Sequence, residues 1–328
     1  MKTYEDPLII VTGAAGFIGS GVLRHLNDKG TSNLVVVDDL GTTEKWKNLV
    51  GKSFSDIINI QQFFSWLEGK ESIINAIIHL GACSSTVEKD ASFLLENNYR
   101  FSVRLAEYAL NHNIRFIYAS SAATYGDGSR GFSDDHDTLE NLVPLNMYGY
   151  SKHLFDLWLK RRGVLDKVVG LKYFNVFGPN EYHKERMASA ILHILPTAQN
   201  EKVIRLFKSS DPENFSDGDQ CRDFIYVKDA VRMTCAFLEN TVSGIFNVGT
   251  GRAGTWNEIA NSVFKALDMP VNIQYIDMPE DLIGKYQNYT RADISKTAGV
   301  LGKDAICDSL ENSVVDYVKN YLVSQGRW

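Results

Sequence analysis

A tyrosine and a lysine four residues apart, in Tyr148-Gly-Tyr-Ser-Lys152, have the spacing of two side chains on one helical face. A free phenol has a pKa of about 10 and is a poor base at neutral pH. A neighbouring ammonium stabilises the phenolate and lowers that pKa, which suits the phenol to proton exchange with an alcohol. The same spacing is common by chance on an exposed helical face, so the pair needs support from the rest of the chain.

A glycine-rich turn near the N-terminus lies between an apolar segment and a helical pattern. The run 9–12 predicts a buried strand, and three glycines follow at three-residue spacing from Gly13 to Gly19. Glycines let the backbone approach a pyrophosphate, and a helix N-terminus offers free N–H groups and a favourable dipole. The next strand ends in Asp38 and Asp39, where a ribose hydroxyl would be bound. The segment predicts a dinucleotide site, and a cationic oxidised nicotinamide bound there would lower the pKa of Tyr148 further.

Hydroxyl side chains follow a third apolar strand, which spans 115–118. Ser120, Ser121 and Thr124 come directly after it, at the carboxyl end of a parallel strand, where ligand crevices lie. Hydroxyls at that place can hold the oxygen of an alcohol or carbonyl that exchanges a hydride. A polar cap on a strand-to-loop turn is the other interpretation of the same residues.

The order of these elements predicts an α/β fold. Strand and helix patterns alternate up to about Gly178, as in a Rossmann-type doubly wound parallel sheet. We expect residues 1–178, with about 224–250, to form a dinucleotide-binding domain. About 179–223, with 251–328, would form a smaller, mixed α/β substrate-binding lobe, with helices at 256–267 and 309–322.

Composition narrows the class of protein. Of the 328 residues, 44% are hydrophobic and 23% charged, which is ordinary for a soluble globular protein. No apolar run approaches the roughly 18 residues of a membrane span, and the first residues lack a signal peptide pattern, so we expect a cytoplasmic protein. The four scattered cysteines have no metal-ligand or disulfide spacing, so no metal is expected. No basic patch interleaved with aromatic residues suggests nucleic acid as a partner.

The glycine turn, the hydroxyl segment and the Tyr–Lys pair, in this order, resemble the extended short-chain dehydrogenase/reductase family. The resemblance implies catalytic roles for Tyr148, for Ser121, which would hold the reacting oxygen, and for Lys152, which would hold the nicotinamide ribose. It also implies a nicotinamide dinucleotide cofactor and a homo-oligomer. The implied cofactor contacts are Gly13, Gly16, Phe17, Ile18, Gly19, Asp38, Asp39, Lys45, Leu80, Gly81, Ala82, Cys83, Ser84, Asn97, Lys152, Val176 and Lys184.

A second lysine, Lys184, follows a Gly-Pro turn after the next strand. A reductase with one base has no evident need for it. An epimerase that oxidises and then reduces one carbon must let hydride leave from one face and return to the other, and a group on each side can then manage each alcohol's proton. Without the family resemblance, a solvated surface lysine is the alternative interpretation of Lys184.

Within the family, the chain resembles the nucleotide-sugar epimerases from about Ile9 to Tyr321. That resemblance implies inversion of C6 of an ADP-linked heptose, a lipopolysaccharide precursor, through a 6-keto intermediate with bound NADP. Tyr148 and Lys184 would be the two acid/base groups. The implied substrate contacts are Ser121, Asn175, Arg186, His193, Phe207, Lys208, Ser209, Ser210, Arg222 and Tyr286.

The charge of the chain supports a local site for an anionic substrate. A net charge of −6 means that whole-protein attraction does not recruit a diphosphate, so local cations must do so. The guanidinium of Arg222 suits bidentate phosphate recognition. A surface ion pair of Arg222 with Asp223 or Asp229 is the alternative.

The chain departs from the family pattern in four places. Ile60 or a near neighbour stands where a cofactor-contacting Lys is expected after the third strand. Asp39 replaces an expected Asn, and its carboxylate would repel the 2′-phosphate of NADP, although Lys45 and Lys47 could compensate; NAD is therefore the alternative cofactor. Arg186 occupies a position at which family members often have a small Ser that contacts the substrate. The loop 211–220 is several residues longer than usual, and both differences affect the nucleotide end of the substrate.

Two rival functions stay open. One is another nucleotide-sugar epimerase or a dehydratase on the same scaffold, such as a UDP-hexose 4-epimerase. A dehydratase typically needs a carboxylate beside the catalytic hydroxyl, and Ser121-Ala-Ala-Thr124 has none. The other is a non-catalytic dinucleotide sensor, which would usually lack the Tyr or the Lys of the pair.

Overall fold

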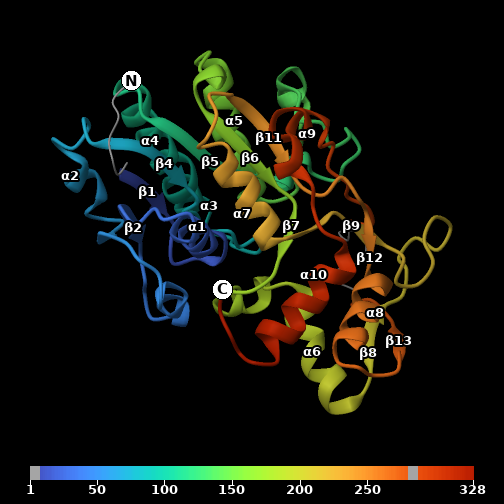
Figure 1. Ribbon diagram of the computed structural model, residues 1–328. Coiled ribbons are helices and arrows are strands. Elements are labelled where there is room, and N and C mark those ends of the chain that lie inside the picture. The colour runs from blue at the N-terminus through green and yellow to red at the C-terminus, as the bar shows by residue number, and fades with distance from the viewer. Residues whose placement is uncertain (1–7, 280–286) are drawn as a thin grey trace.

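The apolar strand segments assemble into a seven-stranded sheet in which neighbouring strands are parallel (Figure 1). The structure is a computed structural model that describes residues 8–279 and 287–328. The strand order is β11-β6-β5-β4-β1-β2-β3, so the direction of winding reverses between β1 and β4. Ligand crevices lie at such a reversal. The strands are β1 (Leu8–Thr12), β2 (Leu34–Asp38), β3 (Asp56–Asn59), β4 (Ile74–His79), β5 (Arg115–Ser121), β6 (Val169–Tyr173) and β11 (Gly244–Val248).

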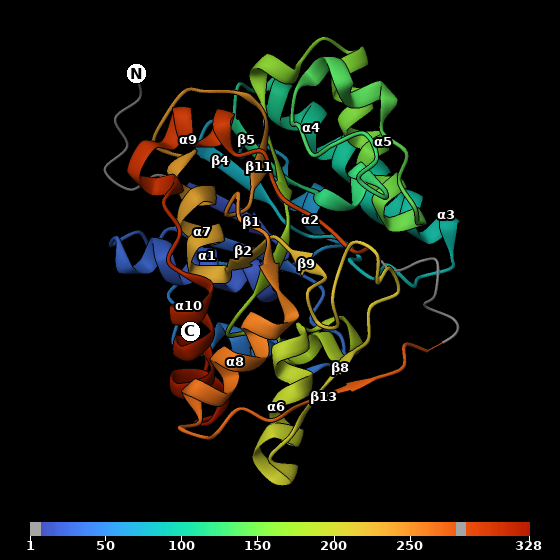
Figure 2. The ribbon, with the colours of Figure 1, turned by 90° about the vertical axis from the view of Figure 1, so that its right-hand side faces the viewer.

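Helices cover both faces of the sheet. Figure 2 shows α1 and α7 on one side and α4 and α5 on the other. Successive strand residues point to opposite faces, so Val11 of β1 packs into the core beneath α1 whereas Ile10 packs into the core beneath α4. Burial on both faces explains why β1 and β2 are nearly continuous apolar runs, whereas the edge strand β3 is mostly exposed. These helices are α1 (Phe17–Asp28), α4 (Phe101–Asn111), α5 (Met147–Arg161) and α7 (Val227–Ala236).

The remaining elements include three two-stranded pairs. β7 pairs with β10 and β8 with β13 in parallel, and β9 pairs with β12 antiparallel. Both ribbon views show α6, β8, α8 and β13 gathered below the sheet (Figures 1 and 2). The bounds are α2 (Phe63–Leu67), α3 (Ala91–Leu94), α6 (Ala190–Glu201), α8 (Trp256–Ala266), α9 (Ser295–Leu301), α10 (Leu310–Tyr317), β7 (Asn175–Phe177), β8 (Ile204–Phe207), β9 (Cys221–Arg222), β10 (Phe224–Tyr226), β12 (Gly254–Thr255) and β13 (Ile273–Ile276).

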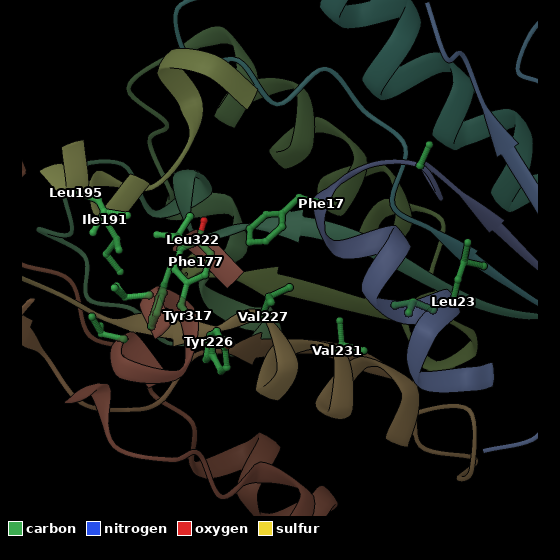
Figure 3. Packing of buried hydrophobic residues seen from close by; sticks show 14 of the residues in the cluster. Phe17, Leu23, Phe177, Ile191, Leu195, Tyr226, Val227, Val231, Tyr317 and Leu322 are labelled. Carbon is green, nitrogen blue, oxygen red and sulfur yellow. The ribbon is translucent and has the colours of Figure 1, made fainter. Parts of the chain in front are cut away.

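A hydrophobic cluster joins the glycine-turn helix to segments much later in the chain (Figure 3). Phe17 of α1 belongs to the same cluster as Phe177, Val227 and Tyr317. The Tyr317 side chain from α10 is fully buried there. α1, and with it the glycine turn, is therefore held by packing against α7 within a cluster that also includes Tyr317 of α10.

The helices predicted at 256–267 and 309–322 are confirmed as α8 and as α10 with its continuation Val318–Leu322. One segment of 251–328 packs on the sheet: Thr297 of α9 donates a 2.7 Å hydrogen bond to the Asn247 carbonyl of β11. In the part of the chain that the structure describes, no helix has the length and apolarity to cross a bilayer.

Candidate active site

A cavity of about 500 Å³ lies along the carboxyl ends of the sheet strands, beside the reversal between β1 and β4. Every residue that the sequence predicted as a cofactor contact lines this cavity, together with Ser121 and Tyr148. Segments far apart in the sequence thus meet in one place because parallel strands end at the same edge. Ser120, predicted as a hydroxyl at this edge, and Ile60 also line the cavity, together with four residues that were not predicted: Phe93, Ala119, Tyr173 and Phe174.

The glycine turn fits a dinucleotide because its backbone is tightly packed and lacks side chains. Gly13 has a φ of +67°, and a Cβ added there would lie 2.7 Å from the Gly81 Cα in the turn after β4. α1 begins after Gly16, and within the described residues no side chain caps that helix end. Its first residues, from Phe17 to Gly19, line the cavity. A helix N-terminus open to the cavity suits a pyrophosphate.

The carboxylate of Asp38 is held at the end of β2 by two hydrogen-bond donors. Its Oδ2 accepts a 2.8 Å hydrogen bond from the Ala15 N–H of the glycine turn. Its Oδ1 forms a 2.7 Å ion pair with Lys45 Nζ. Asp39 is exposed and accepts a hydrogen bond from the Gly41 N–H. The cavity edge where an adenosine ribose would lie therefore carries a paired carboxylate, a lysine and an exposed carboxylate.

Tyr148 lies in the first turn of α5, which packs closely against the loop after β5. The Asn146 side chain caps this helix by accepting a 2.8 Å hydrogen bond from the Gly149 N–H. A Cβ added at Gly149 would lie 2.7 Å from the Ala123 carbonyl oxygen. Burial raises the pKa of Tyr148, and a hydrogen bond with Ser121 partly reverses that rise. The predicted phenol and hydroxyl are therefore partners in one cavity.

Lys152 lies one helical turn after Tyr148 and is 4% exposed. Its Nζ donates a 2.8 Å hydrogen bond to the Ala119 carbonyl of β5. Burial lowers the pKa of Lys152 to about 8, and the charge of Asp156 opposes that decrease. At pH 7 the side chain is mostly protonated. The expectation that its charge lowers the pKa of Tyr148 stays a prediction, because burial raises that pKa and the hydrogen bond with Ser121 is what opposes the rise.

A buried ionic network joins α5 to the ends of β5 and β6, next to Tyr148 and Lys152. The sequence did not predict it. Asp156 of α5 forms a 3.1 Å ion pair with Lys172 of β6, and both side chains are fully buried. Asp156 also accepts a 2.8 Å hydrogen bond from Ser120. Lys172 donates to Thr124 Oγ1, which in turn donates to the Ser121 carbonyl. The network ties α5 to the strand ends that carry the hydroxyls.

Asn97 lines the cavity, but its neighbour Asn98 makes the contacts that hold the adjacent loop. Asn98 is fully buried and forms two 2.9 Å hydrogen bonds with the backbone of Cys83. It also donates a 3.0 Å hydrogen bond to Ser151 of α5. Both asparagines lie in the π-helical turn Leu95–Arg100. In the sequence, the adjacent asparagines were the one signal that could have pointed to Asn98. The cofactor role of Asn97 stays a prediction.

Lys184 lies in the 3-10 segment Tyr182–Met187, after the turn that follows β7. Its Nζ is 5.3 Å from the ring centroid of Phe17 at the start of α1. Desolvation lowers the pKa of Lys184, and the Glu181 carboxylate opposes that decrease. Because Lys184 is partly buried in the cavity that contains Tyr148, the interpretation as a solvated surface lysine is not supported.

Most predicted substrate contacts lie on elements other than those that line the cavity. Among the described residues of that set, only Ser121 lines the cavity. Tyr286 lies outside the described residues, and the roles of the whole set stay predictions. The others are Asn175 on β7, Arg186 in the Lys184 segment, His193 on α6, Phe207 at the end of β8, Lys208, Ser209 and Ser210 after it, and Arg222 on β9.

Fold and cavity together are those of a nicotinamide-dependent enzyme of the short-chain dehydrogenase/reductase type. Residues 9–249 match the NAD dependent epimerase/dehydratase family, and the chain belongs to this family. A nicotinamide dinucleotide is therefore the cofactor that the cavity takes, in agreement with the geometry of the glycine turn.

Its relatives at high identity share one activity in their names. ADP-L-glycero-D-manno-heptose-6-epimerase of Nitratidesulfovibrio vulgaris (strain Hildenborough) is 51% identical over 97% of this chain and 98% of its own length. The protein with the same name from Fusobacterium nucleatum is 44% identical over 98% of this chain and 100% of its own. The crystal structure of the Helicobacter pylori ADP-L-glycero-D-manno-heptose-6-epimerase has a TM-score of 0.78 at 28% identity, covering 96% of each chain.

Proposed function

We propose that the protein is an isomerase that inverts C6 of ADP-D-glycero-D-manno-heptose, giving the L-glycero epimer used as a lipopolysaccharide core precursor. Near-full-length similarity to relatives with this name supports the substrate. The single structural observation that carries the chemistry is that Tyr148 and Lys184, two proton-exchanging groups, line one cavity with the glycine turn. A one-base reductase would not need the second group.

The side chains divide the reaction into two matched halves. A bound nicotinamide dinucleotide supplies a hydride acceptor that afterwards serves as the donor. Tyr148 takes the proton of one C6 hydroxyl as the hydride leaves the same carbon, which yields a 6-ketone. Ser121 donates a hydrogen bond to the ketone oxygen, and Lys184 gives the proton of the epimeric alcohol when hydride returns to the opposite face. Lys152 holds the ribose and favours the phenolate of Tyr148.

The substrate's nucleotide would extend from this centre toward the elements below the sheet. We assign Arg222 to the diphosphate and the remaining predicted contacts to the heptose and ADP, on the strength of the family resemblance. This assignment corresponds to the proposed division into a dinucleotide-binding domain of 1–178 with about 224–250 and a substrate-binding lobe of about 179–223 with 251–328, in which α9 packs back on the sheet.

For the cofactor we propose NADP. Lys45 supports this choice because its ammonium lies beside the ribose edge of the cavity and already neutralises Asp38. The exposed carboxylate of Asp39 is the feature that favours NAD. Denaturing the purified protein and identifying the released nucleotide by mass spectrometry decides the matter: NADP supports the proposal and NAD overturns it.

We also infer a cytoplasmic homo-oligomer. Four free cysteines among the described residues are compatible with a reducing compartment. Leu145, just before α5, is 60% exposed, and Tyr150 on α5 is 45% exposed. These exposed apolar side chains support association through this helix. Light scattering on the purified protein should give a mass of at least two subunits, and a monomer at micromolar concentration would contradict the inference.

The decisive experiment follows the configuration at C6 by proton NMR. The purified protein is incubated with ADP-D-glycero-D-manno-heptose and no added cofactor. Conversion to the L-glycero epimer is expected, because hydride returns to the carbon that lost it and bound cofactor is regenerated. No conversion, even with added NADP or NAD, would reject this substrate. Conversion of UDP-glucose to its 4-epimer in a parallel sample would point to the UDP-hexose alternative.

A further inference from the structure

The segment that carries Lys184 has an unusual backbone on both sides of the lysine. Asn180 and Glu185 have φ angles of +79° and +48°. Positive φ is uncommon for residues other than glycine and persists where surrounding contacts enforce it. None of the six residues of Tyr182–Met187 is fully buried; Tyr182 packs at the edge of the hydrophobic cluster and Lys184 lies beside the Phe17 ring. With so little burial inside the segment, hydrogen bonds made by Asn180, Glu181 and Tyr182 are the main contacts that hold the backbone before Lys184.

Asn180 is bound to the last residue of the chain described here. Its side chain is fully buried, donates a 2.8 Å hydrogen bond to the Trp328 carbonyl and accepts a 2.9 Å hydrogen bond from the Trp328 N–H. Its Nδ2 also donates to Ser20 of α1 at 3.0 Å. The indole of Trp328 packs against Gly21, where an added Cβ would lie 2.8 Å from the ring. One asparagine side chain thus fixes both polar backbone groups of a residue 148 positions later.

Tyr182 is bound to the same C-terminal segment. Its hydroxyl donates a 2.7 Å hydrogen bond to the Gly326 carbonyl. The guanidinium of Arg327 lies 5.1 Å from the centroid of the Tyr182 ring, at the distance of a cation–π contact. Arg327 also donates to Asn48 Oδ1 at 3.2 Å, and Asn48 donates to the Asn180 carbonyl at 3.0 Å. Residues 326–328 therefore contact the side chains of Asn180 and Tyr182 directly, and they reach the Asn180 backbone through Asn48.

Glu181, between these two anchors, is held from α10 and from the far end of the segment. Its carboxylate is 1% exposed and accepts a 2.9 Å hydrogen bond from Tyr317 of α10. It also accepts hydrogen bonds of 2.6 Å from the N–H and the hydroxyl of Ser189. Glu181 thereby closes the loop that contains Lys184, since it joins the residues before and after it. Tyr317 belongs to the hydrophobic cluster of Figure 3.

We propose that residues 326–328 form a C-terminal latch that positions Lys184 in the active site, with Asn180 and Tyr182 as the positioning residues that receive it. The inference rests on the proposed function, in which Lys184 exchanges the proton of one epimeric alcohol. The latch acts on the Lys184 side of the cavity, whereas Tyr148 and Lys152 are positioned by α5 and the strand ends. Loosening the latch should therefore impair the proton exchange at Lys184 and leave the Tyr148 side in place.

Two variants test the latch at different contacts. Tyr182→Phe removes one hydroxyl that bonds a backbone carbonyl, and Tyr108→Phe is its matched control, because the Tyr108 hydroxyl bonds the Leu67 carbonyl on the far side of the sheet. Trp328→Ala removes the indole that packs on α1, and Trp328→Phe is the conservative rescue. We expect kcat to fall roughly 10-fold in Tyr182→Phe and 10- to 100-fold in Trp328→Ala, with cofactor content and KM unchanged, because small misplacements of reacting groups are that costly.

A second readout needs no substrate. Reductive methylation with ¹³C-formaldehyde labels the lysines, and Lys184→Arg identifies the Lys184 resonance, whose titration reports the surroundings of the amine. Burial lowers the pKa of Lys184 in the parent, so both latch variants should move its pKa toward the ordinary value for lysine, and Tyr108→Phe and Trp328→Phe should not. A merely structural role would lower the melting temperature without moving this resonance.

The outcomes separate the latch from the proposed function. Parental kcat and parental Lys184 titration in both Tyr182→Phe and Trp328→Ala would overturn the latch. A parent protein that fails to invert the ADP-heptose would overturn the proposed function, yet the Lys184 titration would still show whether residues 326–328 position the lysine. Loss of activity in the variants with an unmoved Lys184 titration would also overturn the latch.

Discussion

Lys172 and Asp156 form a 3.1 Å ion pair with both side chains fully buried, between β6 and α5 and next to the end of β5, which carries Ser121. Removing one partner of such a pair leaves an uncompensated buried charge. Asp156 also lies one helical turn after Lys152, and its charge opposes the lowering of the Lys152 pKa by burial. The same ion pair therefore stabilises the fold and influences the charge state of Lys152 in the site.

Lys172→Met should lower the free energy of unfolding by about 3–5 kcal/mol, because Asp156 would keep a buried charge without its cation. Urea denaturation measures this change. Arg24→Met serves as the control, since Arg24 and Asp28 form an exposed pair on α1 that should contribute less than about 1 kcal/mol. Equal effects of the two substitutions would show that the buried pair has no special structural role.

Tyr148→Phe and Lys184→Met should each reduce the epimerisation rate by roughly 10²- to 10⁴-fold, the usual contribution of a positioned acid or base. Cofactor content, measured on the nucleotide released by denaturation, should match the parent. Tyr150→Phe removes a similar hydroxyl from the exposed face of α5 and should leave the rate unchanged. A Lys184→Met protein within threefold of the parental rate would refute the second acid/base group.

Gly13→Ala should destabilise the protein by about 3 kcal/mol and abolish stoichiometric cofactor binding. The added methyl would combine a positive φ with a 2.7 Å approach to Gly81. Gly30→Ala separates the two effects, because Gly30 also has a positive φ but nothing within 4 Å of an added Cβ. Its expected destabilisation is about 1 kcal/mol with full cofactor content. Cofactor retained in Gly13→Ala would contradict the assigned pyrophosphate turn.

Lys45→Ala should weaken binding of NADP about 10-fold more than binding of NAD, since the lost ammonium would pair with a 2′-phosphate. Calorimetric titration of the cofactor-free protein measures both affinities. Asp38 would also lose its ion-pair partner, and its uncompensated carboxylate would repel the 2′-phosphate, which adds to the loss for NADP. An equal loss for the two nucleotides would place the 2′-phosphate away from Lys45.

His79 should make the protein less stable in mild acid. Burial lowers the pKa of His79 to about 3, so the folded state keeps the imidazole neutral while the unfolded state binds a proton below about pH 6.5. The stabilisation is present above that pH and is lost as the pH falls toward 3. Between pH 7 and 5 this residue should account for a decrease of about 2 kcal/mol in the free energy of unfolding.

Urea denaturation of the parent and of His79→Gln at both pH values tests this expectation. The decrease on acidification should be about 2 kcal/mol smaller in the variant. Other histidines with lowered pKa, such as His183, contribute equally to both proteins and cancel in the comparison. The same decrease in both proteins would show that His79 does not titrate on unfolding.

His79 also shows how a buried polar residue fixes the turns around the cavity. Its Nδ1 lies 2.7 Å from Thr12 Oγ1 and its Nε2 lies 2.8 Å from Ser102 Oγ. Because the Ser102 hydroxyl donates to the Asn98 carbonyl, His79 must donate through Nε2 and accept from Thr12. Thr12 in turn accepts from the Gly81 N–H, so the chain of hydrogen bonds reaches the cofactor turn.

The sequence by itself determined the elements that bear the chemistry. The apolar run of β1, the glycines after it and the helical spacing of Tyr148 and Lys152 are properties of neighbouring residues, and local backbone preferences decide them. The alternation of strands and helices then required a parallel sheet whose strand ends converge. The predicted cofactor residues therefore lie in one cavity, although their contacts with cofactor stay predictions.

Only the tertiary structure decided which residues position the catalytic and cofactor-binding side chains. The burial of Lys172 against Asp156, the use of Asn98 beside the predicted Asn97, and the attachment of Asn180 to Trp328 all join segments far apart in the chain. Such contacts leave no periodic pattern, because their energy comes from desolvated partners that meet after the chain has folded. The sequence predicted an acid/base role for Lys184, but its position beside the cavity depends on such contacts and could not be read from its neighbours in sequence.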